Sequence, residues 1–218
     1  FANGHLPSLS AARAMIQPGD RLVAADGGAR HLMKLGLTPD LVVGDMDSLT
    51  EVELAELEKA GSRLERYPVE KDETDLELAL KGVLEAGWQR VRIVGALGGR
   101  LDQMLGNLFL LTQALPEEVD LRLDDGVEEV FIIRKQMLIE GERGDLISLL
   151  PLGGPVRGVM TQGLQYQLKG DTLYPERTRG ISNVMLHDQA IVLTSGGDLV
   201  CVHRRKRIKR KVNKKDCK

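Results

Sequence analysis

Apolar and polar positions in the first half of the chain follow the order strand, turn, helix. Residues 22–25, 41–43 and 91–94 are short apolar runs typical of buried strands, and each leads into glycine and aspartate. Helix signals lie between them: Thr50 with Glu53 and Thr74 with Glu77 match capping boxes. A third helix is expected over about residues 102–113. This order predicts an α/β domain over residues 1–124, built on a Rossmann-like parallel sheet.

Near residue 125 the pattern changes to short strand-like segments separated by turn residues. Residues 129–134, 145–150, 185–186 and 190–193 have strand character, and Gly-Gly-Pro and Ser-Gly-Gly-Asp turns lie between some of them. Turns spaced in this way are typical of an all-β sandwich or barrel. We predict a β-sandwich over residues 125–203.

Composition is that of an ordinary globular protein. Of the 218 residues, 42% are hydrophobic and 28% are charged. The sequence shows no signal peptide and no apolar run long enough to cross a membrane, so we expect a cytoplasmic protein without a membrane partner. Cys201 and Cys217 are too few for a disulfide framework or a metal-binding knuckle. Residues 1–4 resemble the end of a strand entering a turn, and we expect a few residues to precede them.

The net charge of -2 conceals an uneven distribution. Residues 204–218 hold 10 of the 30 basic residues and one acid, which leaves the rest of the chain with a net charge of -11. An acidic body argues against specific nucleic-acid binding, because that affinity comes mainly from Lys and Arg on phosphates. We expect residues 204–218 to be a disordered basic tail.

Aspartates stand at the ends of the predicted strands and the starts of the predicted helices. In an open parallel sheet these positions lie at the carboxyl edge, where ligands bind, so their side chains should converge on one crevice. Clustered carboxylates oppose folding unless positive charge lies between them, and Mg²⁺ is a hard cation that takes oxygen ligands. One such aspartate is usually a structural turn or cap residue, but six together favour a metal site. The six are Asp26, Asp45, Asp47, Asp72, Asp75 and Asp102.

Glycines and basic residues beside these aspartates indicate phosphate binding. Gly27 and the Gly98-Gly99 pair allow the backbone to approach a phosphate closely. Arg100 and Lys71 supply positive charge, although for Lys71 a solvated surface charge is an equal alternative. The chain has neither the Gly-x-Gly-x-x-Gly nor the P-loop sequence. These features indicate phosphoryl or pyrophosphoryl transfer from a nucleotide and name no acceptor.

Short motifs follow one another along nearly the whole chain. They are Ala2-Asn3-Gly4, Ala25-Asp26-Gly27-Gly28-Ala29, Pro39-Asp40, Gly44-Asp45-Met46-Asp47-Ser48, Lys71-Asp72-Glu73-Thr74-Asp75, Gly98-Gly99-Arg100-Leu101-Asp102-Gln103, Gly163-Leu164-Gln165-Tyr166 and Gly180-Ile181-Ser182-Asn183. Each is weak alone. As an ordered set over about residues 2–203, they resemble the thiamine pyrophosphokinase family, in its bacterial form.

The resemblance implies transfer of the pyrophosphoryl group of ATP to the hydroxyl of thiamine, which gives thiamine diphosphate and AMP. It also implies a homodimer, with each active site between the α/β domain of one subunit and the β domain of its partner. The residue roles it implies are Mg²⁺ ligands Asp45, Asp47 and Asp75; further catalytic residues Asp72 and Arg100; ATP and phosphate contacts Asp26, Gly27, Thr74 and Asp102; and thiamine contacts Ser182, Asn183 and Gln103.

Two positions depart from the family's pattern, and two other functions stay open. Gln103 stands where many bacterial members have His, and Val184 follows Ser-Asn where an acidic residue is common. These differences concern substrate contacts rather than the reaction. One alternative is an ATP-dependent phospho- or pyrophosphotransferase acting on another small alcohol, such as a pterin. The other is a nucleotide-sensing binding protein whose basic tail binds a polyanion.

Overall fold

The computed structural model describes residues 1–113, 115, 116 and 118–206. The strands expected over 22–25, 41–43 and 91–94 and the helix expected over 102–113 are confirmed, with small shifts at their ends. The shorter α1, α2 and β3 were not predicted. In chain order the elements of the first part are α1 (Leu9–Met15), β1 (Val23–Ala25), a 3-10 turn (Asp26–Gly28), α2 (Ala29–Lys34), β2 (Leu41–Gly44), α3 (Glu51–Lys59), β3 (Arg63–Arg66), α4 (Asp75–Glu85), β4 (Arg90–Ile93) and α5 (Leu101–Leu110).

The second part consists of strands, as predicted from its turn spacing. Strands are confirmed near 129–134, 145–150 and 190–193, whereas the short strand expected at 185–186 lies two residues earlier. One of these strands, β8, is much longer than its sequence pattern suggested. The elements are β5 (Asp120–Asp124), β6 (Glu128–Ile133), β7 (Gln136–Glu140), β8 (Leu146–Gln162), β9 (Lys169–Leu173), β10 (Asn183–Val184), β11 (Gln189–Leu193) and β12 (Gly196–Arg204).

The predicted capping residues begin two of the helices. At α3 the Thr50 side chain and the Glu53 side chain each bond the other's backbone N–H, which completes the capping box. At α4 the Thr74 hydroxyl accepts a hydrogen bond from the backbone N–H of Glu77 at 3.2 Å. The start of α4 is therefore fixed at the edge where the aspartates were expected.

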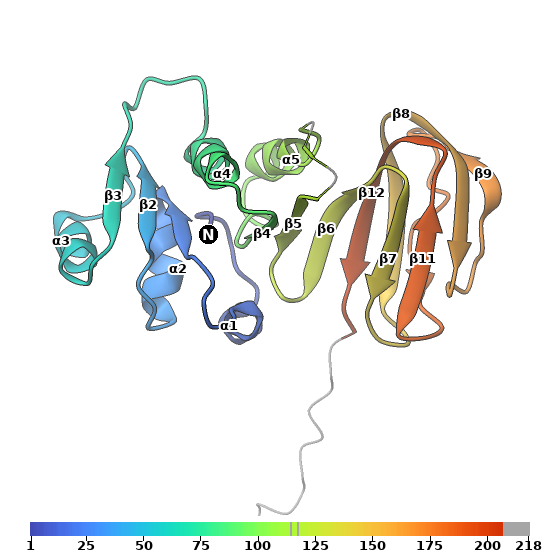
Figure 1. The fold of residues 1–218 in the computed structure, drawn as a ribbon, viewed down its shortest axis with the longest axis horizontal. Helices are drawn as coiled ribbons and strands as arrows, with labels where there is room; N and C mark the ends of the chain where they lie inside the picture. Colours follow the sequence, from blue (N-terminus) through green and yellow to red (C-terminus); the bar gives the residue numbers. More distant parts are fainter. Residues whose placement is uncertain (114, 117, 207–218) are drawn as a thin grey trace, which may run out of the picture.

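The strands form two sheets whose division differs from the prediction. β1, β2 and β3 make a small parallel sheet, while a nine-stranded mixed sheet has the order β4-β5-β6-β12-β8-β11-β7, with β9 and β10 paired to β8 (Figure 1). β4 and β5 therefore belong to the sheet of the second part. The reason is the turn after β5, where Asp124 and Asp125 accept hydrogen bonds from the backbone of residues 126–128 and return the chain directly into β6.

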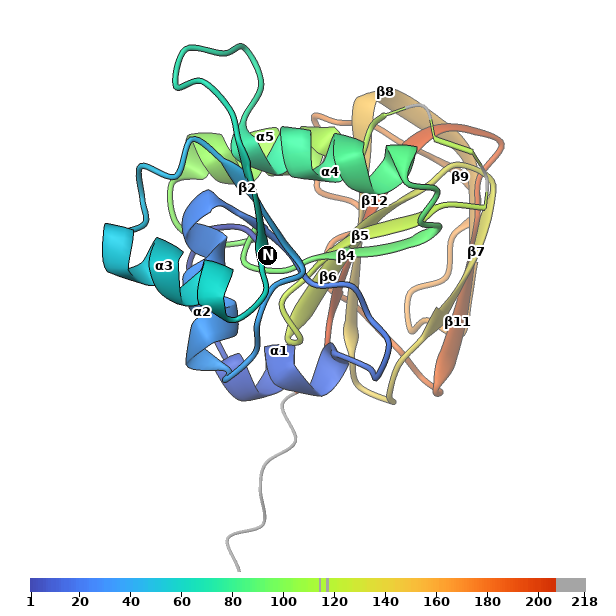
Figure 2. The same cartoon turned by 60° about the vertical axis from the view of Figure 1, so that its left-hand side comes forward.

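Residues 1–4 run between the two sheets. Phe1 bonds β1 through its amino group, which donates to the oxygen of Val23 at 2.7 Å, and through its oxygen, which accepts from Ala25 at 2.8 Å. On the other side the N–H of Ala2 donates to the oxygen of Val94, just after β4, at 2.7 Å. Main-chain hydrogen bonds therefore connect β1 to β4 through this segment, which lies at the middle of the molecule (Figure 2).

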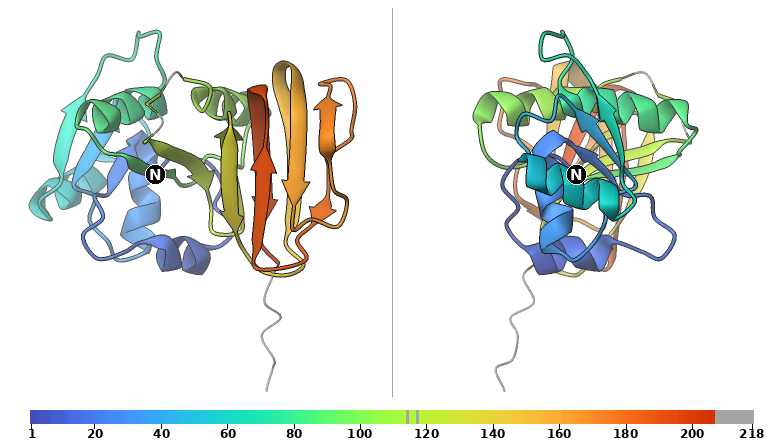
Figure 3. Two further views of the ribbon diagram at one scale, coloured as in Figure 1. Left: turned by 45° about the vertical axis from the view of Figure 1, so that its right-hand side comes forward. Right: turned by 90° about the vertical axis from the view of Figure 1, so that its left-hand side faces the viewer.

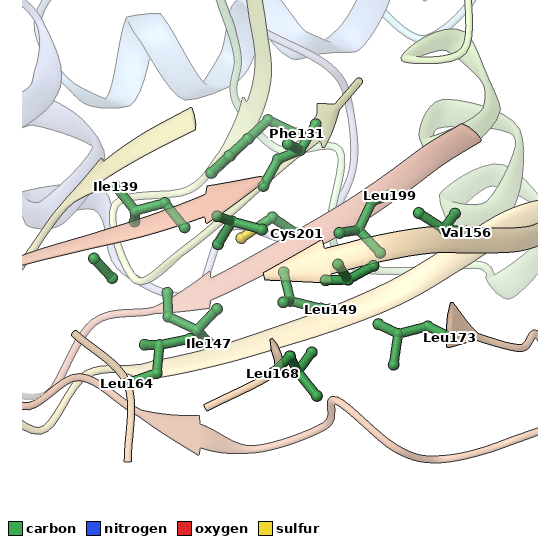
Figure 4. Close-up of a cluster of buried hydrophobic side chains, with 14 of the residues drawn as sticks. Phe131, Ile139, Ile147, Leu149, Val156, Leu164, Leu168, Leu173, Leu199 and Cys201 are labelled. Atoms are coloured by element: carbon green, nitrogen blue, oxygen red, sulfur yellow. The ribbon is translucent and has the colours of Figure 1, made fainter. Parts of the chain in front are cut away.

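The central strand β12 is buried on both faces. Leu199 and Cys201 belong to the core of the all-β part (Figure 4), while Val200 between them belongs to a second core that includes Leu80 of α4 and Leu123 of β5. Successive side chains of a strand point to opposite faces, so one strand serves both cores. The second core holds α4 and α5 against the mixed sheet, where the two helices lie side by side (Figures 1 and 2).

Three residues of the predicted tail belong to the folded part. Arg204 is the last residue of β12, Arg205 pairs with Asp124 at 2.8 Å, and the N–H of Lys206 donates to Asp145 at 2.6 Å. These buried carboxylates need charged or hydrogen-bonding partners, which explains the ordered start. The remainder of the predicted tail, residues 207–218, lies outside the described residues. Within the described ranges, no helix is both long and apolar enough to cross a membrane.

Candidate functional site

Four aspartates gather where β1 and β2 end and α4 begins. Asp26 follows β1, Asp45 and Asp47 follow β2, and carboxylate oxygens of these three lie within 4.8 Å of one another. Asp75, the first residue of α4, meets this group beside Gly44. A Cβ on Gly44 would lie 3.0 Å from both Asp26 Cβ and Asp75 Cγ, so glycine leaves the room that the two carboxylates occupy. We call Asp26, Asp45, Asp47 and Asp75 the acidic cluster.

Lys71 brings a positive charge into the acidic cluster. Its Nζ lies 3.0 Å from Oδ1 of Asp75 and 3.4 Å from Oδ2 of Asp45. Burial raises the pKa of Asp75, and the Lys71 ammonium opposes part of that rise. The pKa of Asp45 is lowered, first by the hydrogen bond from the Asp47 N–H and then by the charge of Lys71. Burial favours loss of the Lys71 proton, but the neighbouring carboxylates outweigh it and raise the pKa of Lys71.

The backbone of the acidic cluster is strained and two of its oxygens lack donors. Asp26 has a φ of 43° and Met46 a φ of 66°, which are left-handed conformations that cost a non-glycine residue about 1–3 kcal/mol. Oδ1 of Asp26 and Oδ1 of Asp75 are shielded from solvent and accept no hydrogen bond from any described residue, the second being in the ion pair with Lys71. Buried carboxylate oxygens of this kind are stabilised by a cation. The donor set therefore fits a hard divalent cation.

The predicted metal ligands Asp45, Asp47 and Asp75 all lie in the acidic cluster, and their role as ligands stays a prediction. The sequence assigned Asp45, Asp47 and Asp75 to the metal, whereas the three oxygens that lie closest together come from Asp26, Asp45 and Asp47. Asp75 is the carboxylate held by Lys71. Asp72 is exposed in the bend before α4, and no described contact brings it into the cluster.

Glycine-rich turns lie beside the cluster and admit no larger side chain. A Cβ on Gly27 would overlap the amide of Asn3, and a Cβ on Gly98 would lie 2.9 Å from the oxygen of His5. The N–H of His5 also donates to the oxygen of Gly98 at 3.2 Å. Residues 3–5, 26–28 and 95–99 therefore pack together, which brings the predicted phosphate-binding turns to one edge.

The start of α5 presents a charged pair next to these turns. Arg100 Nη2 lies 2.6 Å from Asp102 Oδ2, and the N–H of Gln103 donates to Asp102 Oδ1 at 2.9 Å. Both members of the pair are largely exposed, with 75% and 65% of their side-chain surfaces accessible. The pairing lowers the pKa of Asp102 and raises that of Arg100. An exposed guanidinium at a helix start is able to turn toward a phosphate.

Two of the predicted thiamine contacts, Ser182 and Asn183, lie in the all-β part, whereas the third, Gln103, is on α5. Ser182 has a φ of 58°, and its N–H donates to the Ser148 hydroxyl at 3.0 Å. Asn183 is buried: its Oδ1 accepts from the N–H of Tyr166 at 2.9 Å and its Nδ2 donates to the oxygen of Tyr166 at 2.6 Å. Asn183 therefore joins the motif at residues 163–166 to the motif at 180–183, and this bonding was not visible in the sequence. Its contact with thiamine stays a prediction.

The two halves of the predicted site are apart within one chain. The hydrogen bonds of Ser182 and Asn183 that the structure describes are made within residues 147–184. The acidic cluster belongs to the β1–β2 end of the molecule, and Figure 3 shows that end opposite the orange strands of the all-β part. A single copy therefore does not bring the two sets of residues together.

The molecule also has a cavity that the acidic cluster does not line. It has a volume of about 290 Å³ and lies between β1, β4 and α4, with Val23, Leu80 and Val91 in its wall. None of the predicted site residues lines it. The acidic cluster and the glycine turns therefore remain the candidate active site.

Comparisons with known proteins match both halves of the chain. Residues 12–123 match the family model for the thiamin pyrophosphokinase catalytic domain, and residues 134–200 match the thiamin pyrophosphokinase vitamin B1 binding domain. Thiamine pyrophosphokinase of Bacillus subtilis (strain 168) is 31% identical over 182 residues, which are 83% of this chain and 85% of that protein.

Solved structures agree with these matches. A crystal structure of thiamine pyrophosphokinase from Bacillus subtilis aligns with a TM-score of 0.84 at 27% identity, covering 94% of this chain and 97% of that chain. A thiamin pyrophosphokinase family protein from Enterococcus faecalis aligns with a TM-score of 0.80 at 28% identity, again covering 94% and 97%. With family models over most of its length and a relative above 30% identity, the chain belongs to the thiamin pyrophosphokinase family.

Proposed function

We propose that this protein transfers the pyrophosphoryl group of ATP to the hydroxyl of thiamine, giving thiamine diphosphate and AMP. The observation that carries the proposal is the gathering of Asp26, Asp45 and Asp47 at the ends of two parallel strands, in a chain of this family. Oxygen ligands at a glycine-lined edge suit a nucleotide polyphosphate with its metal ion. ATP and thiamine are accordingly the substrates of the proposed reaction.

We infer that Mg²⁺ binds to the acidic cluster. Asp26, Asp45 and Asp47 have oxygens close enough to share one ion, and Asp75 lies beside them. When bound there, a divalent cation neutralises charge on phosphate oxygens. The short aspartate side chains stand on loops at strand ends, so they hold their oxygens in place with little loss of conformational entropy.

The chain's other residues position the polyphosphate and the acceptor. Gly27 and the Gly98-Gly99 turn permit close approach of phosphates to the backbone, and Arg100 is free to leave Asp102 for a phosphoryl oxygen. Thr74 places the N-terminus of α4 at the same edge. The thiamine hydroxyl then attacks the β-phosphorus in line and AMP leaves on the opposite side, a path in which positioning supplies most of the catalysis.

We further propose that the active enzyme is a homodimer, because Ser182 and Asn183 are far from the acidic cluster in one chain. Helix α5 offers a surface for the partner: Leu101, Leu105 and Phe109 follow one another at four-residue spacing and are 64%, 43% and 53% exposed. An apolar row of this kind on an enzyme surface suggests a contact with another protein. A partner's all-β part placed against α5 would lie next to Arg100, which stands at the start of that helix.

We also propose a Rossmann-like first domain and a β-sandwich second domain. Residues 1–4 bond β1 and β4, which supports a Rossmann-like sheet in the order β3-β2-β1, residues 1–4, β4-β5. The bent β8 pairs with β12 by its first half and with β11 by its second half, which supports a β-sandwich around the core in Figure 4. A cytoplasmic location stays a prediction.

The test is AMP release from ATP and Mg²⁺ with and without thiamine, with the thiamine product identified by mass. Thiamine-dependent AMP, matched mole for mole by thiamine diphosphate, is the expected result. ADP with thiamine monophosphate would point to a simple kinase, and AMP formed only with a different alcohol would change the acceptor. Absence of any nucleotide turnover by folded, Mg²⁺-loaded protein would refute the proposal.

A further inference from the structure

The ammonium of Lys71 is surrounded by oxygens inside the acidic cluster. Nζ lies 3.0 Å from Oδ1 of Asp75 and 3.4 Å from Oδ2 of Asp45, and it donates to the main-chain oxygen of Pro68 at 3.0 Å. Two of these contacts are hydrogen bonds, to Asp45 and Pro68, and the third is the ion pair with Asp75. The side chain is only 12% exposed, so Lys71 is not a solvated surface lysine.

The carboxylate oxygens that Lys71 contacts belong to two members of the acidic cluster, where the metal ion is proposed to bind. Oδ1 of Asp45 already accepts the N–H of Asp47 at 3.1 Å, so Oδ2, which faces Lys71, has the greater free capacity. Oδ1 of Asp75 is buried and has no hydrogen bond from any described residue. An ammonium and a divalent cation on the same oxygens repel each other strongly in a partly buried site. The two cations therefore compete.

We propose that Lys71 is an internal counter-ion of the acidic cluster, which a divalent cation displaces from Asp45 and Asp75 and which then turns to the nucleotide phosphates. Lys71 is thus a positioning residue that couples the two ligands. When the metal ion binds without nucleotide, the displaced Lys71 ammonium is left without its carboxylate partners, and this cost weakens metal binding. Nucleotide phosphates accept that ammonium, so metal and nucleotide bind together more tightly than either does alone. This inference rests on the proposed function only in naming a nucleotide as the second ligand.

The first test measures Mg²⁺ and Mn²⁺ binding by calorimetry without nucleotide. We expect Lys71→Met to bind the metal ion about tenfold or more tightly than the wild type, because the competing charge is gone. We expect Lys71→Arg, which keeps the charge, to restore weak binding. Lys81→Met is the matched control, because Lys81 is an exposed lysine on α4 outside the cluster. Metal affinity in Lys71→Met that equals or falls below the wild-type value would overturn the proposal.

The same variants are then titrated with α,β-methylene ATP, whose carbon bridge resists the proposed transfer. In the wild type, metal ion should tighten analogue binding and analogue should tighten metal binding by the same factor. In Lys71→Met this factor should fall by about tenfold, since the displaced ammonium no longer reaches the phosphates. An unchanged factor would refute the coupling.

Chemical labelling of the wild-type protein detects the displacement of Lys71 by the metal ion without the use of any variant. Acetylation of Lys71, quantified by mass spectrometry, should be slow in EDTA, faster with saturating Mg²⁺, and slow again with Mg²⁺ and the analogue. Equal labelling in EDTA and Mg²⁺ would overturn the displacement even if Lys71→Met failed to fold. Thiamine is absent from all three experiments, so their outcome is independent of whether thiamine is the acceptor.

Discussion

His203 and Glu129, 74 residues apart in the chain, meet at 2.9 Å inside the mixed sheet. The other ring nitrogen of His203 lies 2.8 Å from Oδ2 of Asp145. Because each nitrogen faces a carboxylate, both must carry a proton to donate, and the ring is held as imidazolium. Arg122 and Arg205 approach Glu129 at 3.1 and 3.2 Å, so the buried charges are partly balanced. This network joins β5, β6, β12 and the turn before β8.

The first prediction is that the stability provided by His203 declines as pH rises. Burial lowers the pKa of His203, but its hydrogen bonds with Glu129 and Asp145 outweigh that and raise it. The stabilisation is complete below the unfolded value of about 6.5 and is lost as pH rises through the higher folded value. His203→Gln should cost about 3–5 kcal/mol at pH 6, because two buried carboxylates lose their cation. Urea unfolding between pH 6 and 9 measures the difference from the wild type.

That difference should shrink steadily as the pH rises. At acid pH, Glu129 limits stability. Burial alone would raise the pKa of Glu129, but His203 and Arg122 have the larger effect and lower it to about 2. Its contribution is therefore present above its unfolded value of about 4.5 and is lost as pH falls toward 2. A constant gap between His203→Gln and the wild type from pH 6 to 9 would contradict the imidazolium assignment.

A second prediction concerns the glycine that separates two carboxylates. Gly44 has a φ of 151°, and a Cβ there would press on Asp26 and Asp75 at 3.0 Å. Gly44→Ala should therefore lower stability by about 1–3 kcal/mol and weaken metal binding. Gly82→Ala in the middle of α4 is the matched control, because its Cβ would meet nothing within 4 Å. It should stabilise the protein by about 0.5–1 kcal/mol. Equal effects at the two positions would argue against the tight packing.

A third prediction compares Asp26, which the structure places in the acidic cluster, with Asp72, a predicted catalytic residue that the structure leaves exposed outside it. Asp26→Asn should reduce kcat by about 10²-fold or more and raise the Mg²⁺ concentration needed for half-maximal rate, because it removes a charge from the closest oxygens. Asp72→Asn, at an exposed position outside the cluster, should reduce kcat far less than Asp26→Asn does. Asp188→Asn, exposed in the all-β part, serves as the control. If Asp72→Asn were the more damaging variant, the structural assignment would be wrong.

The sequence predicted local order better than it predicted which residues meet. Apolar runs and capping residues located most of the strands and the helix starts, because these depend on neighbours a few residues away. The link from β5 into the mixed sheet depends on a tight turn at Asp124, which the sequence shows only as a composition change. His203 lies on the same face of β12 as Leu199 and Cys201, so the alternation of side chains between the two faces of a strand predicts that His203 is buried. Its two carboxylate partners, 58 and 74 residues away, leave no such pattern.

The candidate site shows the same limit. The motif at residues 44–48 and Asp26 both predict a site, but the separate roles of these residues follow from the family resemblance and not from geometry. The left-handed backbone at Asp26, which turns its carboxylate toward Asp45, is a property of the folded chain. The ion pairs of Lys71 were likewise invisible in a sequence where a solvated lysine was an equal alternative. Close approach of side chains from different strands is decided by packing.

A fourth prediction tests the apolar row on α5. Phe109→Glu and Leu105→Glu each place a charge on a face that the proposed partner would cover. We expect both variants to become monomeric in sedimentation experiments and to lose thiamine diphosphate formation while keeping wild-type circular dichroism. Val52→Glu on α3 is the control, because Val52 is an exposed apolar helix residue, 68% accessible, away from α5. If both variants stayed dimeric, the proposed interface on α5 would be wrong and the dimer contact would lie on another surface.

The fifth prediction asks whether each active site draws on two subunits. Asp47→Asn disables the acidic cluster, and Ser182→Arg fills the predicted thiamine contact in the all-β part. If the two regions act across subunits, a heterodimer of these variants contains one fully native site and one doubly altered site. An equimolar mixture refolded together should then recover about a quarter of wild-type activity, since half of the dimers are mixed and half of their sites are native. If both regions act within one chain, every site carries one defect and the mixture stays as inactive as the separate variants.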